Sequence, residues 1–107
     1  MNFLFLCSQN KLRSPTAETI FADVAGVEVD SAGLNNDAVV RLGGEQLEWA
    51  DVVLVMEVVH RERLNRKFRE FLGGKRIVVL GIPDDYGYMD RELVEILWRK
   101  CRMYLPG

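Results

Sequence analysis

Short apolar runs alternate with one-sided amphipathic stretches along the whole chain, and this alternation restricts the fold more than any other feature. Three of the runs are typical of buried strands, whereas V-E-V-D at residues 27–30 alternates as a strand exposed on one face does. The stretches between the strands carry apolar residues at helical spacing. The pattern predicts strands at residues 2–6, 27–30, 52–56 and 77–80, and helices at residues 14–24, 45–50, 64–72 and from residue 90 onward. Parallel strands need a crossover, which a helix supplies. We therefore expect an α/β fold, a three-layer doubly wound parallel sheet of four strands with helices on both faces.

Composition places the chain among ordinary globular proteins. It has 107 residues without a repeat or linker, so residues 1–107 are predicted to form a single domain. Apolar residues make up 49% and charged residues 28%, and the net charge of −2 gives no reason to expect binding to nucleic acid or membrane. The amino terminus lacks a basic leader, and no apolar run is long enough to span a bilayer.

The cysteine and histidine content indicates the redox compartment and bears on metal binding. Cys7 and Cys101 are too few for a disulfide framework, which favours a reducing, cytoplasmic compartment. With one histidine, His60, the chain offers no credible zinc site, and we expect no metal or cofactor. His60 lies in a charged stretch and is predicted to be a surface residue, whereas Trp49 and Trp98 are predicted to lie in the core.

The strongest candidate site is the loop after the first predicted strand, because ligands of such sheets bind beyond the carboxyl ends of the strands. It reads C-S-Q-N-K-L-R-S, and five residues separate Cys7 from Arg13 at the start of a helix. A tight loop entering a helix turns successive backbone N–H groups toward a tetrahedral anion, and the helix dipole adds a positive field. The predicted phosphate-binding residues are Ser8, Gln9, Asn10, Lys11, Leu12 and Arg13.

Each special side chain of this loop has a chemical reason to be there. Arg13 can hold two phosphate oxygens with its planar guanidinium, which a lysine could not do. The positive field favours the thiolate form of Cys7, the predicted nucleophile, and Ser14 can donate its hydroxyl to that thiolate. Asn10 tolerates the left-handed backbone conformation that a sharp loop needs.

The loop resembles the signature of the low-molecular-weight protein tyrosine phosphatases. That family carries C-x-x-N-x-x-R-S-P-x-A-E, and this chain reads C-S-Q-N-K-L-R-S-P-T-A-E, with the likeness continuing through Ile20 and Phe21. Further likenesses are D-S-A-G at residues 30–33 and A-D at residues 50–51 before the third apolar run. The resemblance covers most of the chain and implies a flavodoxin-like sheet with strand order 2-1-3-4.

A second loop, I-P-D-D-Y-G-Y at residues 82–88, is predicted to reach the same edge of the sheet. A leaving alkoxide or phenolate needs a proton, and a carboxylic acid is a suitable donor. The family carries P-D-P-Y-Y here, so the resemblance implies that Asp84 is the general acid. Asp85 replaces the family's second proline; adjacent carboxylates disfavour each other's ionised form, and Asp85 stays an alternative acid. The resemblance also implies that Tyr86 and Tyr88 flank an aromatic phosphate.

These residues predict a cysteine-dependent phosphatase that hydrolyses phosphate monoesters, above all protein phosphotyrosine, through a phosphocysteine. The chain departs from the family's pattern in four ways. Gln9 stands where the family usually has glycine, Lys11 adds a charge at the rim, and Leu12 replaces the second cysteine of many relatives. The segment from residue 34 to 49 is also shorter than the family's, and that region usually builds one wall of the substrate cleft.

Two other functions stay open from the sequence alone. A thioredoxin-coupled arsenate reductase shares this scaffold and loop, but its relay needs two further thiols, and only Cys101 is available, on the apolar stripe of the last helix. A non-catalytic module that binds phosphate or phosphopeptides is favoured by Gln9 and the shortened segment. The presence of both a nucleophile and an acid argues against it, because a binding module needs neither.

Overall fold

A computed structural model describes residues 1–106, and its centre is a single parallel sheet. The strands are β1 (Asn2–Cys7), β2 (Glu28–Gly33), β3 (Val52–Val55) and β4 (Arg76–Val79). They pair in the order β2-β1-β3-β4, and all three pairings are parallel. The predicted fold class and strand order are therefore confirmed.

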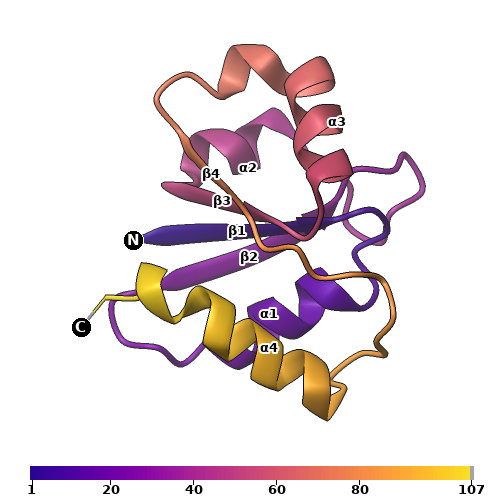
Figure 1. Cartoon of the computed structure of the whole chain (residues 1–107). Helices are drawn as coiled ribbons and strands as arrows, with labels where there is room; N and C mark the ends of the chain where they lie inside the picture. Colours follow the sequence, from indigo (N-terminus) through magenta and orange to yellow (C-terminus); the bar gives the residue numbers. More distant parts are fainter. Residues whose placement is uncertain (107) are drawn as a thin grey trace.

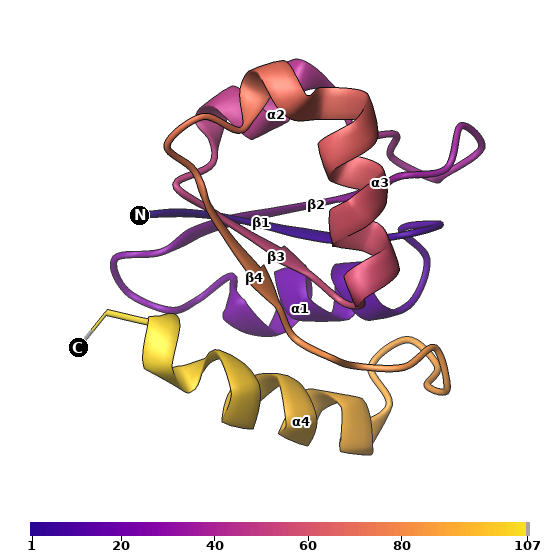
Figure 2. The same cartoon turned by 45° about the horizontal axis from the view of Figure 1, so that its top comes forward.

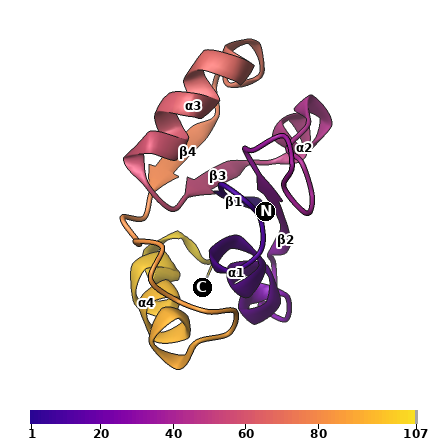
Figure 3. The same ribbon diagram turned by 90° about the vertical axis from the view of Figure 1, so that its right-hand side faces the viewer.

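Four helices cover the sheet on both faces, as predicted. They are α1 (Arg13–Phe21), α2 (Gly44–Trp49), α3 (Val58–Phe68) and α4 (Arg91–Cys101). Helices α1 and α4 lie against one face and α2 and α3 against the other, which gives three layers (Figures 1 and 3). Helix α3 begins six residues before the predicted range of 64–72, and that range ends in a 3₁₀ turn, Arg69–Phe71.

Strand β1 supplies the centre of two cores because its side chains alternate between the faces of the sheet. Phe3, Phe5 and Cys7 pack toward α1 and α4, whereas Leu4 and Leu6 pack toward α2 and α3. All five are almost completely buried. Trp49 and Trp98 are partly buried and pack against these cores, one on each face of the sheet.

The start of α1 differs from its prediction in a way that concerns the site. The sequence predicts Ser14 as the helix cap, yet the helix already includes Arg13, and no side chain caps it. The Ser14 hydroxyl instead contacts the Cys7 sulfur. At α4 the predicted cap is confirmed, since the Asp90 carboxylate accepts a hydrogen bond from the backbone N–H of Glu92.

The loops that follow β1 and β4 lie at the same end of the sheet, beyond the carboxyl ends of the strands (Figure 2). The fold therefore brings the two predicted parts of the site together. Within residues 1–106, no helix has the length and apolar character needed to cross a membrane.

Candidate functional site

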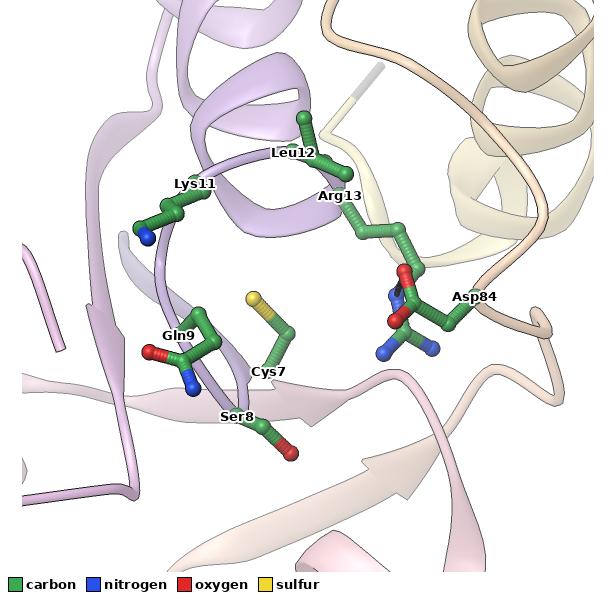
Figure 4. A pocket seen from close by; sticks show the side chains of 7 residues that line it. All are labelled: Cys7, Ser8, Gln9, Lys11, Leu12, Arg13 and Asp84. Carbon is green, nitrogen blue, oxygen red and sulfur yellow. Dashed lines mark ion pairs between the residues drawn. The ribbon is translucent and has the colours of Figure 1, made fainter.

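A small cavity of about 80 Å³ lies where the loop after β1 meets the loop after β4. Figure 4 shows the Cys7 sulfur between Gln9 and Lys11 on one side and Arg13 and Asp84 on the other. The stretch from the end of β1 to the start of α1 supplies all of the lining residues except Asp84. They are Cys7, Ser8, Gln9, Lys11, Leu12, Arg13 and Asp84.

The segment after β2 shapes the loop from outside. Its backbone N–H groups donate hydrogen bonds to three successive loop carbonyls: Leu34 N to Cys7 O (3.0 Å), Asn35 N to Ser8 O (2.9 Å) and Val39 N to Gln9 O (3.0 Å). In a trans peptide the N–H points opposite to the carbonyl. The next three loop amides therefore point away from this segment, the orientation that a backbone anion nest requires.

Cys7 ends β1, and its sulfur lies 3.0 Å from the hydroxyl oxygen of Ser14. That oxygen also accepts a hydrogen bond from Asn10 Nδ2 at 2.9 Å. With the amide donating to the oxygen, the Ser14 hydroxyl proton is free to be donated to Cys7. The Ser14 hydroxyl can thus act as a hydrogen-bond donor to the sulfur that the sequence predicts as the nucleophile.

Asn10 turns the loop, and the D-S-A-G stretch at residues 30–33 supports it. Asn10 has a φ of 55°, so its predicted left-handed conformation is confirmed. Its Nδ2 also donates to the hydroxyl oxygen of Ser31 at 2.9 Å. Two residues further on, a β-carbon at Gly33 would lie only 2.6 Å from the carbonyl oxygen of Ser8. The end of β2 thus supports the loop in two ways. Ser31 accepts a hydrogen bond from Asn10, and Gly33 leaves the space that the Ser8 carbonyl occupies.

Arg13 is buried, with 4% of its side chain exposed, and two acceptors fix its guanidinium. Its Nη1 donates to the carbonyl oxygen of Ile82 and to Oε2 of Glu57, each at 2.7 Å. Its Nε lies 3.6 Å from Asp84 Oδ1. A buried guanidinium needs such partners, because an unpaired buried charge is strongly destabilising.

Sequence reasoning missed Glu57, although a signal for it was present. It is the second residue after β3 and therefore emerges at the same end of the sheet as the predicted site. A carboxylate at that place had a predictable partner in Arg13.

The loop after β4 brings its predicted residues to different places. Asp84 is 65% exposed and lines the cavity, whereas Asp85 is exposed outside it. Tyr86 is partly buried against the core on the side of α1 and α4. Tyr88 is half exposed, and its hydroxyl is hydrogen-bonded to Thr19 at 2.9 Å. Neither tyrosine lines the cavity.

His60 is not the surface residue that the sequence predicts; it is completely buried. It lies in the first turn of α3, and its Nε2 is 3.0 Å from the hydroxyl oxygen of Ser8 in the loop. Burial and the positive charge of Arg13 lower the pKa of His60 from 6.5 to about 4. The prediction was wrong because the charged residues that follow His60 obscured the fact that this turn packs behind the loop.

Of three comparisons with known proteins, only the comparison with solved structures finds a match. No protein-family model matches the sequence, and no curated protein does. Solved structures do match, and those of several phosphatases are among them. The YwlE arginine phosphatase from Geobacillus stearothermophilus is 23% identical with a TM-score of 0.76; the match covers 96% of this chain and 92% of that one.

Two tyrosine phosphatases match equally well. The enzyme Wzb from Escherichia coli K30, in complex with phosphate, is 20% identical with a TM-score of 0.78, over 96% of this chain and 94% of that one. A low-molecular-weight protein tyrosine phosphatase from Streptococcus pyogenes is 14% identical with a TM-score of 0.79, over 97% and 90%. At these identities the likeness establishes the fold. The chain has the low-molecular-weight phosphatase fold that its signature loop implied.

Proposed function

We propose that this chain is a cysteine-dependent phosphatase that hydrolyses phosphate monoesters, with phosphotyrosine in proteins as its substrate class. One observation carries the proposal: the Cys7 sulfur, the Arg13 guanidinium and the Asp84 carboxylate share one small cavity beside a backbone anion nest. A nucleophile, an anion clamp and a proton donor are the parts that this reaction needs. The likeness to solved phosphatase structures supports the same conclusion.

The reaction has two steps in this geometry. In the first, Cys7 attacks phosphorus, a sulfur–phosphorus bond forms, and the bond to the leaving oxygen breaks as Asp84 gives that oxygen a proton. In the second, Asp84 takes a proton from water, which attacks the phosphocysteine, releases inorganic phosphate and restores the thiolate. The loop amides and Arg13 hold the other phosphate oxygens throughout both steps.

Arg13 is oriented for this task by the acceptors that it already has. Its Nη1 is engaged by Glu57 and Ile82, which leaves Nε and Nη2 to hold two phosphate oxygens. A phosphate oxygen bound to Nε would replace the 3.6 Å contact of Nε with Asp84 Oδ1 and leave that carboxyl group beside the bound phosphate. Positioning and electrostatic stabilisation then supply most of the catalysis, as in phosphoryl transfer generally.

The arsenate reductase alternative finds no support at Cys101. This cysteine is completely buried in α4, and burial raises its pKa to about 12. A relay thiol must be accessible and must form a thiolate, and Cys101 meets neither condition. Both cysteines are free, and we infer that the protein works in a reducing compartment, the cytoplasm.

The decisive experiment removes the nucleophile. We expect the wild-type protein to hydrolyse p-nitrophenyl phosphate at mildly acid pH without added metal, and Cys7→Ser to reduce turnover to the background rate. Cys101→Ala is the matched control and should keep its activity. Appreciable turnover by Cys7→Ser would contradict the mechanism, and a wild-type protein that binds phosphate without turnover would be a binding module.

The neighbouring carboxylates separate the general acid from its alternative. Asp84→Asn should lower kcat by roughly a hundredfold or more for leaving groups of high pKa, and far less for those that need no proton. Asp85→Asn, its matched control, should change kcat little because Asp85 does not line the cavity. A larger loss in Asp85→Asn would move the acid to that residue.

A comparison of substrates tests the substrate class. Initial rates should be measured on one peptide carrying phosphotyrosine, phosphoserine or phosphoarginine at the same position. Faster hydrolysis of phosphotyrosine would support the proposal. Preference for phosphoarginine would align the chain with the arginine phosphatase among its structural neighbours and would reject the tyrosine assignment.

A further inference from the structure

The stretch from Cys7 to Arg13 is called the phosphate loop below. Near both of its ends it is hydrogen-bonded to residues at the start of α3. At the loop's beginning, the Ser8 hydroxyl oxygen lies 3.0 Å from His60 Nε2. At its end, Arg13 donates to Glu57, the residue that precedes α3. Because α1 and α3 lie on opposite faces of the sheet, these bonds hold the loop from the layer across from its own helix (Figure 3).

The proton on the His60 ring can be assigned from its partners. The backbone N–H of Glu57 points at His60 Nδ1 over 3.1 Å, and a backbone N–H can only donate. Nδ1 is therefore the acceptor, and the neutral ring carries its proton on Nε2. The contact between His60 and Ser8 is then a hydrogen bond in which the imidazole donates and the Ser8 oxygen accepts.

Ser8 is held by further bonds that converge on the same position. Arg63 Nη1 lies 3.4 Å from the Ser8 hydroxyl oxygen, and Arg63 Nη2 donates to Asn35 Oδ1 at 2.6 Å. The backbone N–H of Asn35 in turn donates to the Ser8 carbonyl. With two donors on its hydroxyl oxygen and one on its carbonyl, Ser8 is fixed through both its side chain and its backbone. Its own amide is the first of the loop amides after Cys7.

We propose that His60 is a positioning residue for the phosphate loop: its Nδ1 is anchored on the start of α3, and its Nε2–H fixes Ser8 and thereby the first amides of the anion nest. The proposal rests on the proposed function only in naming phosphate as the anion. His60 does not line the cavity, so it acts through Ser8 and has no contact with the substrate. Donors held in place before the reaction are worth most, because nothing has to reorganise when charge develops.

Two conservative substitutions separate positioning from simple helix stability. In His60→Asn the amide oxygen can still accept from Glu57 N–H, but the side chain is too short to reach Ser8. In His60→Gln the side chain can accept through Oε1 and donate through Nε2, so that both bonds can be kept. We expect His60→Asn to lower kcat/KM for p-nitrophenyl phosphate by about tenfold and His60→Gln to recover most of that loss. Equal activity of wild type and His60→Asn, at equal thermal stability, would overturn the proposal.

A double-mutant cycle tests whether His60 acts through Ser8. Ser8→Ala and His60→Asn should each lower kcat/KM, and the double variant should lose little more than either single variant. Losses that multiply would mean that the two residues act independently, which contradicts the proposal. Thermal unfolding of the three variants accompanies the kinetics, since a purely structural role would lower activity only in proportion to unfolded protein.

Two measurements do not depend on turnover and keep this inference distinct from the proposed function. In the Cys7→Ser background, calorimetric titration with inorganic phosphate should show weaker binding for His60→Asn than for His60→Gln. Nitrogen-15 spectra of the wild-type imidazole near neutral pH should show a neutral ring protonated on Nε2. A ring protonated on Nδ1, or equal phosphate affinity in the two variants, would reject the positioning role even if the protein proves to be a phosphatase. If the wild-type protein hydrolyses no phosphate ester but these two results hold, only the proposed function fails.

Discussion

Acidification should destabilise the folded chain through His60. A histidine in an unfolded chain has a pKa of about 6.5, whereas the pKa of His60 is about 4 in the folded protein. At a pH between these two pKa values, His60 binds a proton in the unfolded chain but not in the folded chain. The free energy of unfolding therefore falls as pH falls. The contribution is complete above about pH 6.5 and is lost progressively toward about pH 4. At about 1.4 kcal/mol for each pH unit, the loss over this window is roughly 3 kcal/mol.

The surroundings of His60 explain the size of the effect. Burial is the largest cause of the low pKa, and the positive charges of Arg13 and Arg63 act in the same direction. Glu57 and Asp84 favour the protonated ring and reduce the effect without reversing it. These charged groups come from the start of α1, from α3 and the residue before it, and from the loop after β4.

Urea unfolding at several pH values, followed by circular dichroism, measures this contribution. Carboxylates also titrate in the window, so the informative quantity is the free energy of unfolding of the wild type minus that of His60→Gln, which lacks the titrating ring. This difference should decrease by more than about 2 kcal/mol between about pH 7 and about pH 4.5. A difference that stays constant across the window would refute the assignment of His60 as a buried neutral imidazole.

Two further predictions concern the loop and its cysteine. Gly33→Ala should lower the free energy of unfolding by about 1–3 kcal/mol and reduce kcat/KM, because the new methyl group meets the Ser8 carbonyl at 2.6 Å. Gly43→Ala, where a β-carbon meets nothing within 4 Å, is its control; equal behaviour of the two variants would contradict the close packing. Iodoacetamide should alkylate Cys7 in the native protein and spare Cys101, whose buried thiol has a pKa of about 12. Peptide mass spectrometry checks this, and native labelling of Cys101 would show that α4 opens.

The sequence predicts the sheet and its layers because the signals for them are local and repeated. Each predicted strand is a short segment with its own pattern, and the helices between the strands leave only parallel pairing. The phosphate loop is predictable for another reason: its residues are contiguous, so spacing alone brings Cys7, Asn10 and Arg13 together. The contact between Cys7 and Ser14 belongs to the same continuous stretch and was expected as well.

The supports of the loop could not be predicted in the same way because they come from distant parts of the chain. The place of Glu57 after β3 indicates only the end of the sheet at which it lies. His60 reaches the loop only when α3 packs across the sheet, and a helix periodicity does not reveal which end of a helix is buried. Residues 34–43 have no period at all, yet their backbone donors hold three loop carbonyls. Backbone hydrogen bonds of this kind leave almost no trace in residue type, since every residue except proline can donate them.

These contacts give the segment after β2 a role that the sequence does not suggest. From the sequence, residues 34–49 stand out as a missing wall of the substrate cleft, which would argue against catalysis. In the structure this segment instead orients the loop amides, and the end of β2 and the start of α3 hold the loop from two further directions. Stabilisation of the transferred phosphoryl group depends on how rigidly the donors around it are held, whereas a cleft wall contributes binding of the rest of the substrate. A short segment after β2 is therefore sufficient to hold the loop that the proposed chemistry requires.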